Sequence, residues 1–161
     1  MRLLTIENIK LFDKNNNIKY EQSNVKNILH QLGELYMLNS LFVKNKTTRS
    51  DFYWAGLDNR STLSTSDIMS SFVNEPSANG YNRQKIISWS SPVLVGSVHL
   101  IKSDPITFSA SSGGWGPVKN IFLTTTKNND GYLISSVKLN QELTLVAGDS
   151  AVLVMNLSLS N

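Results

Sequence analysis

The side chains that could perform nucleophilic or acid–base chemistry are few and scattered. The chain of 161 residues has no cysteine and only two histidines, His30 and His99. A Ser–His–acid triad would need one of them beside a serine, but 22 serines make such a neighbour a matter of chance, and no Gly-x-Ser-x-Gly turn is present. Because neither histidine has a second histidine nearby in the sequence, the pattern also predicts no metal site.

Paired carboxylates are the other chemistry to consider. Asp51, Asp58, Glu75 and Asp104 could supply the two acids of a glycoside hydrolase, but their spacing is that of ordinary loop acids. The segment 111–116 (SSGGWG) is rich in glycine, yet it lacks the lysine and the following helix of a phosphate-binding loop. We therefore expect a protein that is not an enzyme and that uses no cofactor.

The composition limits the kinds of partner. A net charge of +3 without any motif of interleaved aromatic and basic residues argues against nucleic acid. No apolar stretch approaches about 18 residues, so we expect no membrane span, and the opening MRLLTIENIKLF has no long apolar segment typical of a signal peptide. The sequence thus predicts a protein made in the cytoplasm, with neither nucleic acid nor membrane as a partner.

The clearest pattern in the sequence is that of residues 104–123, which predicts two strands joined by a turn. Ile106, Phe108 and Ala110 alternate with polar residues as in a half-buried strand. The following SSGG breaks the strand, and residues 115–117 (WGP) are expected to turn the chain into a second strand over 118–123. The indole of Trp115 is expected to cover the open end of a core between two sheets, with direct contact to a partner as the alternative.

A hairpin and a helix are expected before residue 50. Residues 8–20 predict a β-hairpin, because two apolar runs flank the turn cluster 13–17 (DKNNN). Residues 23–42 predict an amphipathic helix capped by Ser23 or Asn24. Its apolar positions recur at three- and four-residue steps: Val25, Ile28, Leu29, Leu32, Leu35 and Tyr36. This helix would pack across a sheet edge or, alternatively, between subunits on assembly.

The remaining chain is expected to be β-structure. The basic connector 44–50 (KNKTTRS) suggests an N-terminal appendage over 1–48 and a β-domain over 49–161. Seven or eight short strands follow residue 50, at the spacing of an antiparallel β-sandwich, jelly-roll-like, in a mainly β fold. The loop 58–80, with a short helical turn near 66–69, is long enough to be functional or ordered by a partner.

Four short motifs carry a resemblance to a known family. They are GYNRQ at 80–84, ITF at 106–108, WGPV at 115–118 and AGDS at 147–150. In this order, after an N-terminal helix and the Ala-Gly-Leu of 55–57, the chain resembles a family of small tailed-bacteriophage virion proteins, described as tail fibre or head decoration proteins. The resemblance covers roughly residues 24–159, while the loop 58–80 departs from the glycine-rich version expected there.

The resemblance implies a structural component of the virion that binds neighbouring virion proteins and copies of itself. The expected function is a capsid decoration (cement) protein on the major capsid protein. The alternatives are a neck or tail component, such as a tail-fibre or fibre-attachment protein, and a carbohydrate-binding sandwich that uses Trp54, Trp89 or Trp115. The candidate partner-binding residues, chosen for aromatic or loop character, are Phe52, Tyr53, Trp54, Ile68, Met69 and Trp115.

Overall fold

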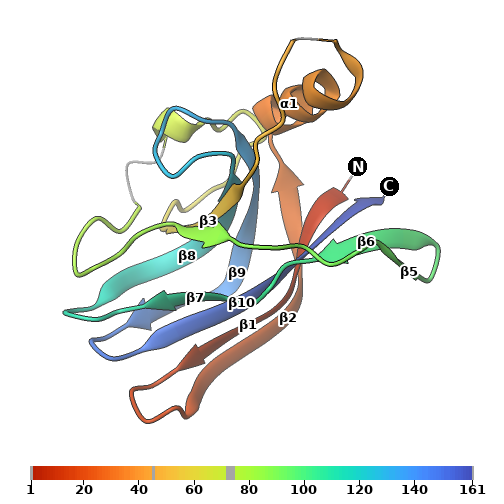
Figure 1. Cartoon of the computed structure of the whole chain (residues 1–161). Helices are drawn as coiled ribbons and strands as arrows, with labels where there is room; N and C mark the ends of the chain where they lie inside the picture. The colour runs from red at the N-terminus through yellow and green to blue at the C-terminus, as the bar shows by residue number, and fades with distance from the viewer. Residues whose placement is uncertain (1, 45, 72–74, 161) are drawn as a thin grey trace.

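Ten antiparallel strands and one helix make up the part of the chain that the computed structural model describes, residues 2–44, 46–71 and 75–160 (Figure 1). The strands are β1 (Arg2–Phe12), β2 (Ile18–Leu29), β3 (Tyr53–Asp58), β4 (Gln84–Ile86), β5 (Val93–Val95), β6 (Val98–Lys102), β7 (Ile106–Ser109), β8 (Trp115–Thr124), β9 (Leu133–Leu145) and β10 (Ser150–Ser160). The helix is α1 (Gln31–Phe42), and a short 3-10 turn, η1, covers Met69–Ser71.

The strands form two antiparallel layers that share a bent strand. Their order is β4-β3-β8-β9-β2-β1-β10-β6-β5, and β7 also pairs with β10. The first part of β2 pairs with β1, whereas Asn27–Leu29 pair with β9, so β2 passes from one layer into the other. The predicted antiparallel β-sandwich is therefore confirmed.

The predicted N-terminal hairpin is also confirmed, and it is longer than expected. Its turn is held by the Asp13 carboxylate, which accepts hydrogen bonds from the backbone N–H groups of Asn15 and Asn17, while Asn16 adopts a left-handed φ of 69°. We expected residues 1–48 to be an appendage. Instead β1 pairs with β10 along its length and Ile9 and other hairpin residues enter the common core, so the hairpin is an integral part of the sandwich.

The helix is shorter than the sequence pattern predicts. Residues 23–29, expected as its first two turns, belong to β2, so the predicted caps Ser23 and Asn24 are wrong. The three- and four-residue spacing of Val25, Ile28 and Leu29 fits a helix, but pairing with β1 and β9 decides in favour of a strand. The helix starts after His30, whose backbone is extended and whose side chain makes no cap.

The predicted corner at residues 115–117 is wrong as well. The chain turns earlier, and β8 already begins at Trp115, which pairs with Leu145 of β9. The Gly116–Pro117 peptide is cis and coincides with an irregularity in the ladder between Trp115 and Val118. The irregularity lets a proline stand inside a strand, because the ladder hydrogen bonds are interrupted there.

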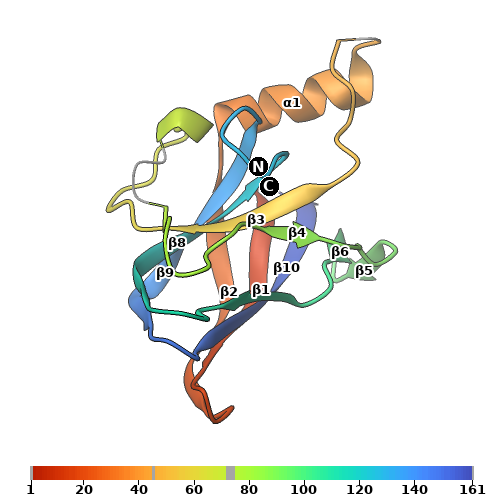
Figure 2. The same ribbon diagram turned by 60° about the vertical axis from the view of Figure 1, so that its left-hand side comes forward.

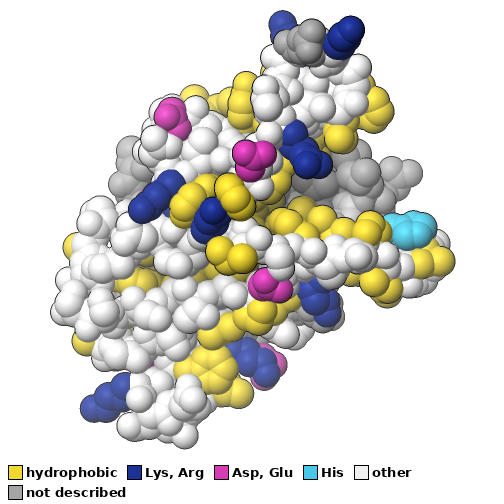
Figure 3. Space-filling view, viewed as in Figure 1, with side chains coloured by type: hydrophobic (Ala, Val, Ile, Leu, Met, Phe, Trp, Pro, Cys, Tyr) yellow, Lys and Arg dark blue, Asp and Glu magenta, His cyan; other side chains and the backbone are white. Residues whose placement is uncertain are grey.

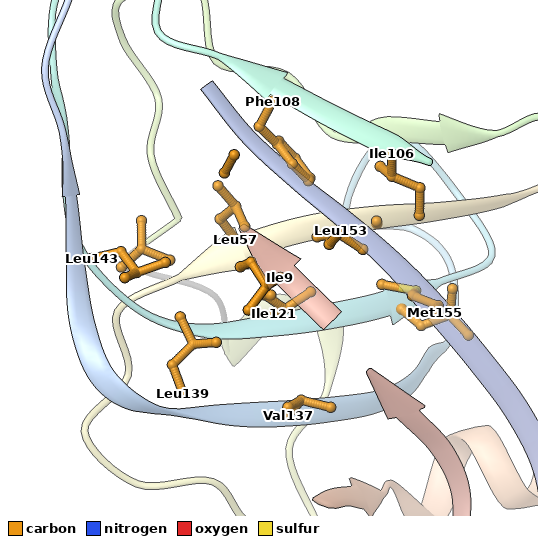
Figure 4. Close-up of a cluster of buried hydrophobic side chains, with 14 of the residues drawn as sticks. Ile9, Leu57, Ile106, Phe108, Ile121, Val137, Leu139, Leu143, Leu153 and Met155 are labelled. Carbon is orange, nitrogen blue, oxygen red and sulfur yellow. The ribbon is translucent and has the colours of Figure 1, made fainter. Parts of the chain in front are cut away.

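The core lies between the two layers. Ile9, Phe108 and Leu153 from one layer and Leu57 and Ile121 from the other are almost completely buried, and Figure 4 shows them converging on the same space. Because these side chains come from strands across the whole chain, one continuous apolar core holds both layers together.

Candidate functional site

In the structure a histidine lies beside a serine, a pairing that the sequence alone could not predict. His30, at the junction of β2 and α1, lies with Nε2 2.8 Å from Oγ of Ser136 on β9. Arg60 Nη2 donates to the same Oγ over 3.1 Å. A guanidinium can only donate, so Ser136 Oγ accepts a hydrogen bond from Arg60 and shares a second hydrogen bond with His30 Nε2, whose direction is set by the histidine tautomer. His30 and Ser136 are 106 positions apart in the sequence, so no local sequence motif contains both.

This pair is enclosed in the sandwich and closed off from solvent. Both side chains are 0 % exposed, so no substrate reaches Ser136 Oγ. Burial, and then the charge of Arg60, lower the pKa of His30, although the backbone carbonyls of Ser64 and Thr65 partly favour its protonated form. Nδ1 has no hydrogen-bond partner among the described residues, so no acid orients the ring as in a triad.

A buried ion pair adjoins the histidine and fixes the start of the 58–80 loop. Asp58 accepts from Arg60 Nε (3.0 Å) and Nη2 (2.9 Å), and also from Asn120 Nδ2 (2.9 Å). Arg60 Nη1 reaches Asp67 Oδ2 at 2.7 Å, which ties the far side of the loop to the same guanidinium. This part of the loop is therefore held by its own chain through charge-assisted hydrogen bonds.

A second polar cluster holds the end of that loop. Tyr81 donates to Glu75 Oε1 (2.7 Å) and accepts from the Leu57 N–H (2.8 Å), and Arg83 Nε donates to the same carboxylate oxygen at 2.9 Å. Burial raises the pKa of Tyr81 strongly, and the neighbouring Glu75 charge raises it further. The tyrosine therefore stays protonated, and its hydrogen bonds connect the loop to the sheet.

Two of the six candidate partner-binding residues are packing residues. Met69 is buried with Phe122 and Leu133. Trp115 is 4 % exposed, meets the Tyr81 ring edge-on at a centroid distance of 5.3 Å, and donates through Nε1 to the Asn79 carbonyl (3.3 Å). Neither side chain is available to a partner in this structure. The expectation that Trp115 covers the core is correct, and its expected docking role is not supported.

The other four candidates lie nearer the surface, and Phe52 and Tyr53 line the same pocket. Phe52, immediately before β3, is exposed and carries Lys85 Nζ over its ring at 3.1 Å from the centroid. Tyr53 and Trp54 are half-buried within β3. Ile68 is exposed just before η1, in the loop.

α1 also carries exposed apolar side chains, three of which, Leu38, Leu41 and Phe42, the sequence pattern did not single out. Leu35, Leu38, Leu41 and Phe42 are 49–78 % exposed. Helical geometry puts Leu35, Leu38 and Phe42 opposite Gly33, which packs against the sheet together with Tyr36 and Met37. Leu41 lies on the flank of the helix, next to Met37. The helix is therefore apolar on two faces and not amphipathic as expected. Such a helix is usually covered on both sides.

The β5–β6 hairpin is a second exposed apolar feature. Val93, Leu94 and Val95 of β5 are 53–58 % exposed, and β5 is the last strand of its layer. Figures 1 and 2 show this hairpin projecting from the sandwich as an arm, and apolar side chains gather over it in Figure 3. An apolar edge strand without a charged residue is a pairing surface.

An apolar groove of about 320 Å³ connects the two features. It runs between α1 and β6, and its apolar lining includes Tyr36, Met37, Leu41, Leu100, Ile101 and Leu157. We refer to the exposed apolar side chains of α1 (Leu35, Leu38, Leu41 and Phe42) as the α1 face, and to β5 and β6 as the β5–β6 arm. Together with the groove they concentrate exposed apolar surface at one end of the molecule.

Neither a metal site nor a membrane-spanning helix is found among the described residues. Over residues 2–44, 46–71 and 75–160, no group of three or more His, Cys, Asp or Glu side chains could hold a metal ion. None of the helices in the described segments is long and apolar enough to span a membrane. Comparison of the sequence with protein-family models and with curated proteins gave no match. Only the geometry of the α1 face and of the β5–β6 arm therefore indicates where the protein could bind a partner.

Proposed function

We propose that the protein is a non-enzymatic structural component of a bacteriophage particle, and specifically a capsid decoration protein that binds the major capsid protein and copies of itself. The observation that carries this proposal is the exposed apolar surface formed by the α1 face and the β5–β6 arm. Contiguous apolar surface of this kind marks a protein-docking site. The resemblance of the turn motifs to virion proteins supplies the kind of partner.

The interior chemistry supports an assembly role. The groups that could react, such as His30 and Ser136, are sealed inside the sandwich and hold loops in place. Tyr81 and Arg83 act in the same way on the 75–83 segment. A rigid sandwich with ordered loops loses little conformational entropy on docking, which favours binding through many modest contacts repeated over a shell.

A neck or tail component is the second candidate. The projecting β5–β6 arm favours it, because an exposed edge strand can extend the sheet of a single neighbouring protein. The carbohydrate-binding alternative loses support, since Trp115 is buried and Trp54 and Trp89 are only half-exposed. Aromatic platforms for sugars need an open ring face.

The copy number in purified particles tests the proposal. Peptide mass spectrometry would compare peptides of this chain with those of the major capsid protein. A number comparable with that of the capsid protein is expected for a decoration protein, whereas a far smaller number would assign the chain to the neck or tail. Absence from purified particles would contradict a virion role altogether.

A further inference from the structure

The outer side of α1 has the residue spacing of a helix–helix seam. Gln31, Leu35, Leu38 and Phe42 follow one another at steps of four, three and four residues, so they form one stripe along the helix. Figure 2 shows α1 lying across one end of the sandwich, and none of the described strands covers its outer side. The stripe is fixed outward, because a Cβ at Gly33 would lie 2.4 Å from the Ile134 carbonyl oxygen on the opposite side.

The charges at the two ends of α1 are of opposite sign. Glu34 lies in the first turn and is exposed, while Lys44 and Lys46 follow the last turn and are exposed too. In the described part of the chain, none of these three side chains has an ion-pair partner. An antiparallel neighbour would place its Lys44 and Lys46 beside Glu34, and would also align the helix dipoles favourably. A parallel neighbour would place like charges together.

The exposed area is sufficient for a specific contact. Five apolar residues at or next to the α1 face, Leu35, Leu38, Leu41, Phe42 and Val43, are 48–78 % exposed. Each of these side chains exposes on the order of 100 Å², so together they supply roughly 500 Å² of apolar area. This area is enough for the apolar centre of a standard interface, which buries about 800 Å² per partner. Gln31, Glu34 and the two lysines supply the polar rim.

From these observations we infer that the protein forms a two-fold dimer in which α1 packs antiparallel against α1 of a second copy. The inference deepens the proposed function by naming the occupant of the α1 face, and it rests on that proposal in treating this face as a docking surface. An antiparallel pair is isologous, so each copy contributes the same stripe. Leu38, near the middle of the stripe, lies next to the two-fold axis.

The solution mass of the purified full chain tests the dimer. Size-exclusion chromatography with light scattering over a concentration series should give twice the chain mass of 17.9 kDa. Leu38→Lys should give 17.9 kDa with an unchanged circular dichroism spectrum, because Leu38 is 50 % exposed in the single chain. Leu94→Lys is the matched control: it makes the same change at a 58 % exposed leucine on β5 and should remain dimeric.

Charge reversal tests the antiparallel orientation. Glu34→Lys alone and the pair Lys44→Glu with Lys46→Glu should each weaken self-association several-fold, and their combination should restore it. A wild-type protein that is monomeric at all concentrations would overturn the inference. So would a combined variant as weak as the single reversals, or a dimer that Leu94→Lys dissociates and Leu38→Lys does not. Absence from particles would instead contradict the virion role and leave the measured dimer unaffected.

Discussion

Replacement of Gly33 by alanine separates helix propensity from tertiary packing. In a helix interior, alanine is favoured over glycine by about 1 kcal/mol, so propensity alone predicts a more stable protein. In this structure Gly33 lies in α1 against β9. A Cβ added there would lie 2.4 Å from the Ile134 carbonyl oxygen and 2.6 Å from its Cα. These are backbone atoms that cannot rotate away, so the helix itself must move.

The magnitude follows from what such a movement disrupts. Forcing an extra methyl group into a packed contact costs about 1–3 kcal/mol. The Ile134 carbonyl that the methyl group would meet also accepts the hydrogen bond of the His30 N–H (3.0 Å), and losing that bond costs about 1 kcal/mol more. Tyr36, whose ring centroid lies 5.1 Å from that of Tyr132, would lose part of this contact when the helix moves. Together these losses exceed the propensity gain, and we expect Gly33→Ala to lower the free energy of unfolding by about 2 kcal/mol.

Urea denaturation followed by circular dichroism measures this effect. The variant is best compared in the Leu38→Lys background, so that self-association does not contribute to the unfolding free energy. Asn39→Ala, on the other side of α1, is the control and should leave stability unchanged or raise it by a few tenths of a kcal/mol. If Gly33→Ala were as stable as the parent or more stable, the close approach of α1 to β9 would be refuted.

Three further substitutions probe the interior. His30 has a lowered pKa in the folded protein, so acid protonates the unfolded chain first. Stability should therefore fall below about pH 6.5 by up to about 1.4 kcal/mol per pH unit. In urea titrations at several pH values, His30→Gln should remove that slope. Trp115→Ala should cost about 3–5 kcal/mol in the same assay, and a loss of partner binding without a loss of stability would contradict its place in the core. Asp58→Asn should cost about 3–5 kcal/mol, because Arg60 stays buried with its main partner gone; an unchanged midpoint would contradict the ion pair.

The strands could be predicted from sequence where local chemistry decides them. The turn at 13–17 is recognisable because Asp and Asn stabilise it by hydrogen bonds within the turn, and the alternation at 106–110 marks which face of β7 is buried. The last part of β2 could not be predicted in this way. Its apolar spacing satisfies both a helix and a strand, and the pairing that decides between them involves β9, more than 100 residues away.

The candidate site was less accessible to sequence reasoning than the fold. Leu35 and Tyr36 looked like members of one buried helix face, yet Tyr36 faces the sheet and Leu35 faces outward. Only the contact of Gly33 with β9 determines which side of α1 faces the sheet and which side faces outward. The size and setting of Trp115 predict that it covers the core, but its large aromatic surface suggests a docking residue equally well. The burial of its ring decides for packing.

Protection of the α1 face in assembled particles tests the central claim most directly. The chain has no cysteine, so a single introduced cysteine reports only on its own position. Leu38→Cys should resist maleimide labelling in intact particles and react after dissociation by denaturant, whereas Gln141→Cys, at an exposed position of β9, should react in both. Equal labelling of the two variants in intact particles would contradict the conclusion that assembly covers the α1 face.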